Sequence, residues 1–166
     1  ADSRVTTTAD KAYAWGAQVT ESAKPLPYVK TVDASVTKTF AETLRVEYDA
    51  TTGKNLGALI EAPSTNLCRR SEEIGDTPWG NAYLSHVINA SIAPDNTLSA
   101  TKITFEDNDT ARTEQPVPST AGANYTWSLW MKAGTKNLAR LQLSGSDSGS
   151  VTFDLTSDWK RFSVTG

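Results

Sequence analysis

The strongest constraint on this chain is a two-residue alternation of apolar and polar side chains, which recurs throughout its second half. It is clearest at residues 125–132 and returns at residues 140–144, 151–156 and 161–164. A period of two places successive side chains on opposite faces of a β-strand, and residues typical of turns separate the four runs. Several short strands at this spacing predict an all-β chain, folded as a jelly-roll-like antiparallel β-sandwich.

The first half contains one further run of this kind, at residues 12–19. Strict alternation there places Trp15, Ala17 and Val19 on one face of the strand and Gln18 on the other. Two prolines, Pro25 and Pro27, then interrupt regular structure, because proline has no backbone N–H to donate to a sheet.

Composition argues against several classes of function. The net charge of −3 disfavours a nucleic-acid partner, which requires a basic face. No stretch approaches the roughly 18 apolar residues of a membrane helix, so no membrane partner is expected. The one cysteine, Cys68, cannot form an internal disulfide, and the one histidine, His86, lacks the nucleophile motif of a serine hydrolase. No spacing pairs two carboxylates as glycoside hydrolysis requires, so we expect no enzymatic activity.

Several motifs in the order of the chain resemble one family. They are the segments at residues 57–67, 70–72, 93–103, 121–134 and 158–165, together with Trp79. These segments resemble modules of phage tail and structural proteins, which are themselves similar to the β-sandwich carbohydrate-binding modules of polysaccharide-degrading enzymes. The resemblance implies a galactose-binding-like sandwich that binds a polysaccharide or glycan without catalysis. It also implies a viral or secreted protein, located outside the cell or on the virion surface.

The order of the segments departs from that family. Residues 13–19 and 27–29 resemble the family's final strand and exit segment, yet they come first. The chain is then a circular permutant, a fragment across two tandem repeats, or a chain whose first strand completes a neighbouring sandwich. We expect residues 10–20 to pair with the C-terminal sheet, within one chain or by strand exchange in a homo-oligomer, because an unpaired sheet edge invites aggregation. The chain therefore divides into a final-strand-like segment at residues 1–30, a connector at 31–63 and the main body of the sandwich at 64–166.

Trp130 lies on the polar face of its predicted strand, and its indole is a candidate sugar-binding group. Trp130 shares a face with Ser128 and Lys132, among polar side chains. Aromatic faces stack on sugar rings, and neighbouring polar groups bind the hydroxyls. If the first and later strands are neighbours in one sheet, one concave surface gathers the candidate ligand-binding residues Trp130, Lys132, Arg140, Gln142, Asp154 and Gln18. The alternative is that a loop or a partner covers Trp130.

Calcium is a second candidate ligand. Related sugar-binding sandwiches often hold a structural calcium between the opening loop and the final strand, so the resemblance implies calcium ligands in Glu72 and Glu73. Carboxylate oxygens are the ligands that calcium requires. The final-strand-like segment lacks the acids that often stand there, a departure that weakens this implication.

A fold does not fix a function, so a second hypothesis remains open. In it, the chain is a structural or adaptor domain of a virion that assembles through its sandwich faces or by strand exchange, without binding sugar. The Thr-rich connector and the early position of the final-strand-like segment favour this alternative.

Overall fold

The computed structural model of the chain describes residues 10–38, 45–48, 55–59, 64–106, 111–144 and 149–166. These residues form antiparallel β-sheets and contain no helix, so the predicted all-β class is confirmed. None of the described residues belongs to a helix that could cross a membrane.

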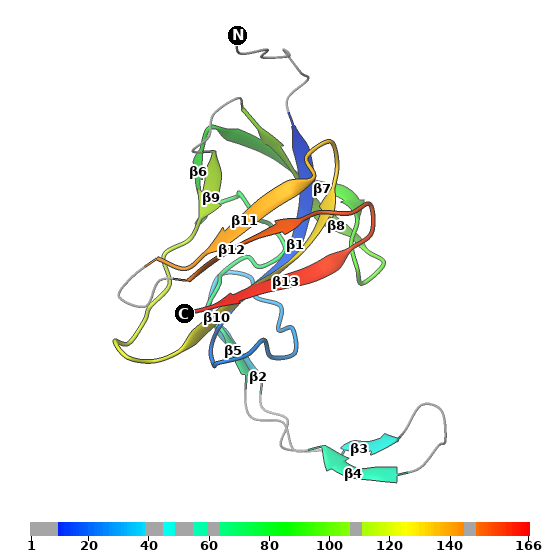
Figure 1. Cartoon of the computed structure of the whole chain (residues 1–166), viewed down its shortest axis with the longest axis vertical. Coiled ribbons are helices and arrows are strands. Elements are labelled where there is room, and N and C mark those ends of the chain that lie inside the picture. Colours follow the sequence, from blue (N-terminus) through cyan, green and yellow to red (C-terminus); the bar gives the residue numbers. More distant parts are fainter. Residues whose placement is uncertain (1–9, 39–44, 49–54, 60–63, 107–110, 145–148) are drawn as a thin grey trace.

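A five-stranded antiparallel sheet forms the centre of the molecule (Figure 1). In spatial order its strands are β13 (Lys160–Thr165), β10 (Tyr125–Ala133), β1 (Lys11–Glu21), β8 (Leu98–Phe105) and β7 (Leu84–Ile92). The other strands form four antiparallel pairs: β11 (Leu138–Gln142) with β12 (Ser150–Asp154), β6 (Gly80–Ala82) with β9 (Arg112–Glu114), β2 (Val36–Lys38) with β5 (Ser64–Asn66), and β3 (Arg45–Tyr48) with β4 (Asn55–Leu59). The predicted connector at residues 31–63 therefore contains β2, β3 and β4.

The hydrophobic core lies on one face of the five-stranded sheet, called here the core face. From this sheet it takes the buried side chains of Ala12, Ala14, Ala17, Val19, Ile103, Tyr125, Leu129, Met131 and Val164. A second layer packs against them, in which the β11–β12 hairpin contributes Leu141 and residues 67–79 contribute Cys68, Ile74 and Trp79. The described chain therefore has the two packed layers of a β-sandwich-like fold. The opposite face of the five-stranded sheet is called the outer face.

Strand β1 lies in the middle of this sheet although it comes first in the chain. It pairs with β10 from Ala12 opposite Ala133 to Glu21 opposite Tyr125, and with β8 over residues 11–14. The prediction that residues 10–20 pair with the C-terminal sheet is thus confirmed. Two strands of the C-terminal region, β10 and β13, lie on one side of β1, and β8 and β7 lie on the other.

A β-bulge at Gly16 changes which side chains of β1 face the core. Trp15 lies opposite Trp130 and Gln18 opposite Ser128, so two residues, Gly16 and Ala17, face a single residue of β10. Gly16 has a φ of +66°, and a Cβ there would lie 3.2 Å from Cδ1 of Trp130. Glycine is favoured at such a position because the left-handed conformation is costly for other residues.

The bulge overturns the strict alternation predicted for this strand. Ala17 and Val19 lie in the main core with Ala12 and Ala14, whereas Trp15 is buried in a separate cluster. The prediction that Trp15, Ala17 and Val19 share one face is therefore wrong. The extra residue shifts the phase of the pattern by one position, as any one-residue slip in a strand does.

The carboxamide of Asn66 links β1 to Val29 and Cys68, which lie in two neighbouring segments. Its Oδ1 accepts hydrogen bonds from the backbone N–H groups of Val19 (3.2 Å) and Cys68 (3.1 Å). Its Nδ2 donates to the carbonyl oxygens of Ala17 (3.0 Å) and Val29 (2.7 Å). Asn66 is fully buried, so these four bonds satisfy backbone groups that water does not reach.

We expect Asn66→Ala to lower the free energy of unfolding by about 3 kcal/mol, because it leaves buried backbone donors and acceptors without partners. Urea denaturation followed by tryptophan fluorescence measures this loss. The matched control, Asn124→Ala, changes an exposed asparagine and should stay within about 0.5 kcal/mol of the unmutated protein. Equal stabilities for the two variants would contradict the role given to Asn66.

Candidate functional site

The structure does not bring the six predicted ligand-binding residues onto one surface. Trp130, Lys132 and Gln18 belong to the outer face of the five-stranded sheet, because they alternate with residues of the core. Arg140, Gln142 and Asp154 belong to the β11–β12 hairpin, which lies over the core face. The predicted single concave surface is therefore wrong. It required β10, β11 and β12 to be neighbours in one sheet, and β11 and β12 pair with each other instead.

Trp130 does lie on the polar side of its strand, but it has partners there. It packs in a cluster with Trp15, Tyr28 and Trp159, and Tyr28 comes from the proline-containing segment after β1. The predicted alternative, in which a loop covers Trp130, therefore describes its surroundings better than an open sugar site does.

Lys132 is likewise held within the molecule. Its Nζ lies 4.9 Å from the ring centroid of Trp159 and 5.1 Å from that of Tyr13, and it donates to Oγ of Ser91 at 2.9 Å. These contacts are typical of a cation held over aromatic rings.

Gln18 cannot line a ligand surface, because its side chain is fully buried. Its Oε1 accepts from the backbone N–H of Val29 at 2.7 Å. Its Nε2 donates to the carbonyl oxygens of Leu26 and Pro27, each at 3.2 Å. The predicted role in ligand binding is therefore wrong: Gln18 fastens residues 26–29 to the outer face.

The predicted calcium ligands are bound by two different cations of the protein. The carboxylate of Glu72 lies 2.5 Å from Nζ of Lys30 and accepts a hydrogen bond from the hydroxyl of Tyr28. Burial, together with the charge of Glu72, raises the pKa of Tyr28 above its ordinary value, so this phenol stays protonated. Glu73 pairs instead with Arg70 at 2.6 Å. In the part of the chain that the structure describes, no group of three His, Cys, Asp or Glu residues could hold a metal ion, and the calcium prediction gains no support.

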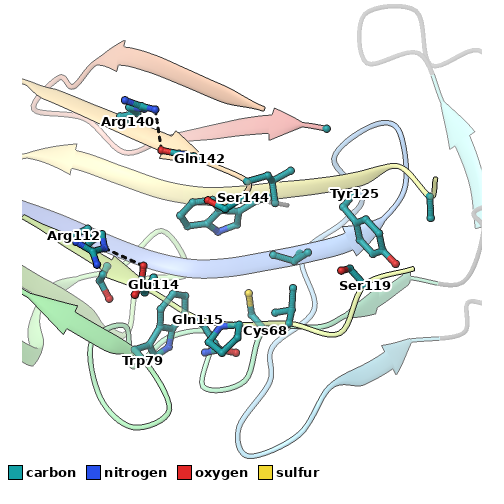
Figure 2. A pocket seen from close by; sticks show the side chains of 18 of the residues that line it. Cys68, Trp79, Arg112, Glu114, Gln115, Ser119, Tyr125, Arg140, Gln142 and Ser144 are labelled. Carbon is teal, nitrogen blue, oxygen red and sulfur yellow. Dashed lines mark hydrogen bonds and ion pairs between the residues drawn. The ribbon is translucent and has the colours of Figure 1, made fainter. Parts of the chain in front are cut away.

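A cleft of about 870 Å³ opens on the core-face side of the sandwich (Figure 2). Its apolar lining includes the aromatic side chains of Trp79, Tyr125 and Trp127. Polar residues also line the cleft, namely Arg112, Thr113, Glu114, Gln115, Ser119, Thr120, Arg140, Gln142 and Ser144. Two predicted residues, Arg140 and Gln142, thus line the cleft, whereas Asp154 is exposed on β12 outside it.

The cleft exists because the second layer is not one continuous sheet. β9 pairs with β6, and β11 pairs with β12, so these two strand pairs have no ladder of hydrogen bonds between them. The core face of β10 therefore contributes Tyr125 and Trp127 to the cleft lining. The hydroxyl of Tyr125 accepts a hydrogen bond from the backbone N–H of Thr120 at 2.9 Å, which holds the chain after β9 at the side of the cleft.

Two buried polar atoms in the cleft lining have no hydrogen-bond partner. They are Nε1 of Trp127 and Oγ1 of Thr113. Buried donors and acceptors in folded proteins are almost always paired, so an unpaired one calls for an explanation.

The chain matches no protein-family model, no curated protein and no solved structure. Its function must therefore be argued from the residues of the cleft. Trp127 is not recognisable as a site residue from the sequence, because it shares a strand face with Leu129 and Met131, which predicts a core position. Trp127 does pack against the core, and it also lines the cleft between the strand pairs β6–β9 and β11–β12.

Cys68 also lines the cleft, and its thiol gives a measurable prediction. Burial raises its pKa to about 12, since the low dielectric around the thiol disfavours the charged thiolate. The unfolded thiol ionises near pH 9, so at pH 8 the folded protein should hold roughly a thousandfold less thiolate than the unfolded protein. Ellman's reagent should therefore react slowly with the native protein and rapidly in denaturing urea at the same pH. Equal rates in the two conditions would contradict the buried position of this side chain.

Proposed function

We propose that this protein is a non-catalytic glycan-binding module and that the cleft between β9 and β11 is its binding site. The observation that carries the proposal is the combination of aromatic and polar side chains in the lining of one cleft. The resemblance of the sequence motifs to phage tail modules supports a viral or secreted protein acting outside the cell or on a virion surface.

The chemistry of the cleft suits a sugar ring. An indole face can stack on the C–H face of a pyranose. Of the three aromatic residues in the lining, Trp127 is half-buried, whereas Trp79 and Tyr125 are buried in the core, so Trp127 is the ring proposed to stack on the sugar.

The hydroxyls of Ser119 and Ser144 can both donate and accept hydrogen bonds, as sugar hydroxyls require, and the Nε2 of Gln142 can donate. The amide of Gln115 is already bonded to the backbone of Arg69 through both of its polar atoms. The volume of about 870 Å³ falls in the range of pockets that hold small organic ligands.

The same cleft favours binding over hydrolysis. Glycosidases place two carboxyl groups across the scissile bond, about 5–9.5 Å apart. Among the described side chains that line this cleft, Glu114 is the one carboxylate, and it is paired with Arg112 at 3.0 Å. This arrangement supports a role in attachment to a polysaccharide.

Removing the indole with Trp127→Ala should weaken glycan binding about tenfold or more, because stacking on the ring is lost. A glycan array followed by calorimetry on the strongest ligand measures the effect. Trp130→Ala, which removes an indole from the outer face, is the matched control and should leave affinity unchanged. If Trp130→Ala abolished binding while Trp127→Ala did not, the site would lie on the outer face and not in the cleft.

Because Trp127 packs against the core, a second variant tests the cleft without touching its lining indole. Ser144→Trp places a large ring at an exposed edge of the cleft and should block the ligand, whereas Ser35→Trp adds the same ring at an exposed position elsewhere. Melting temperatures verify that both variants fold. Absence of any saccharide binding by the unmutated protein would overturn the proposal.

One observation favours the second candidate function, a structural adaptor. The β3–β4 hairpin pairs with itself and with no strand of the five-stranded sheet, and it extends away from the body of the molecule (Figure 1). A two-stranded hairpin is at best marginally stable alone in water. A partner subunit that packs on this hairpin would stabilise it.

The adaptor hypothesis predicts an oligomer that depends on this hairpin. Light scattering coupled to gel filtration should then show a stable dimer or trimer for the full chain. Replacing residues 45–59 with a short Gly-Ser linker should yield a monomer whose melting temperature is nearly unchanged. The measurement is made at a protein concentration of about 100 μM, where even an oligomer of modest affinity would be populated. A chain that is monomeric at this concentration would contradict self-assembly through the hairpin.

A further inference from the structure

Two polar pairs lie on opposite sides of the cleft (Figure 2). On β9, Nε of Arg112 donates to Oε2 of Glu114 at 3.0 Å. On β11, Nη2 of Arg140 donates to Oε1 of Gln142 at 2.8 Å. In each pair the residues are two positions apart on one strand, so their side chains leave the same face. In both pairs an arginine donates to the side chain two residues further along the strand, but the acceptor is a charged carboxylate in Glu114 and a neutral amide in Gln142.

That difference leaves one arginine charge without compensation. Arg112 is bound to a carboxylate, which balances its charge. Arg140 is bound to a neutral amide, and among the residues that the structure describes no carboxylate pairs with it. A guanidinium has five N–H donors, so Arg140 retains most of its hydrogen-bonding capacity for a ligand. Its side chain is exposed and belongs to the cleft lining.

The side chains that the structure describes in the cleft lining carry one more positive charge than negative charge. The charged side chains of this described lining are Arg112, Arg140 and Glu114, whereas the chain carries a net charge of −3.

We propose that the cleft selects glycans that carry a carboxylate, such as uronic or sialic acid residues. The inference rests on the proposed function and adds the substrate class. The sugar ring stacks in the aromatic part of the cleft, and the carboxylate binds the guanidinium of Arg140 through two parallel N–H···O bonds. Arg112, whose charge Glu114 already balances, adds no net charge on the opposite side.

The test compares acidic oligosaccharides with their own carboxyl-reduced forms on the full chain. Each uronate-containing oligosaccharide is paired with the neutral sugar made by reducing its carboxyl groups, so the two differ in that group alone. We expect the acidic form to bind about tenfold more tightly, as a charge-assisted bidentate contact implies. This preference should weaken in salt, because the side chain is exposed.

Substitutions at Arg140 then assign the effect. Arg140→Gln should abolish the preference for the acidic form while leaving the affinity for the neutral form unchanged. Arg140→Lys should retain part of the preference, because lysine keeps the positive charge but lacks the planar guanidinium that binds a carboxylate through two bonds. Lys160→Gln removes one positive charge at an exposed position outside the cleft, so it controls for the overall charge of the protein.

The outcomes separate this inference from the proposed function. Equal affinity for acidic and neutral forms, with binding still lost in Trp127→Ala, overturns the carboxylate selectivity and leaves the glycan-binding function standing. A preference that persists in Arg140→Gln overturns the role of Arg140. Failure of both forms to bind overturns the inference together with the proposed function.

Discussion

The buried carboxamide of Asn66 is the contact on which the rest of the architecture depends. β1 pairs with β8 over residues 11–14, and beyond the bulge its backbone bonds instead to the segment that follows β5. Ala17 N–H donates to the carbonyl of Ser71 and Leu67 N–H donates to the carbonyl of Val19, both at 2.8 Å. Asn66 fills the space between these bonds and also binds Val29. The Asn66 side chain therefore bonds to the central strand β1, to Val29 in the segment that follows β1, and to Cys68 in the second layer.

The cleft follows from how the second layer is divided. The strand pair β6–β9 and the β11–β12 hairpin are separate two-stranded sheets, and aromatic residues of β10 line the cleft between them. In a sandwich whose second sheet is continuous, the same indole would be buried under a ladder of backbone hydrogen bonds. The candidate site is thus a product of how the described strands pair, more than of any local motif.

The sequence predicted the strands well, because their alternation is a local property. Runs at residues 125–132 and 161–164 correspond closely to β10 and β13, and residues 12–19 fall within β1. The phase of β1 was not predictable from alternation, since the bulge depends on Gly16 fitting against Trp130 and Tyr28, which lie elsewhere in the sequence. The burial of Gln18 depends in the same way on the path of residues 26–29. For the candidate site, Arg140 and Gln142 were predicted from the sequence. The residues of β9 that line the same cleft were not, because their position depends on which strands pair.

The central position of β1 has a consequence for the order of folding. Its partner β10 lies more than 100 residues later in the chain, as the pairing of Ala12 with Ala133 shows. During synthesis the first strand leaves the ribosome long before that partner exists, and the sheet cannot close until β10 has been made. We expect nascent chains that end before residue 125 to keep residues 15–21 accessible to proteases, and their protection to appear once residues 125–133 can pair with them.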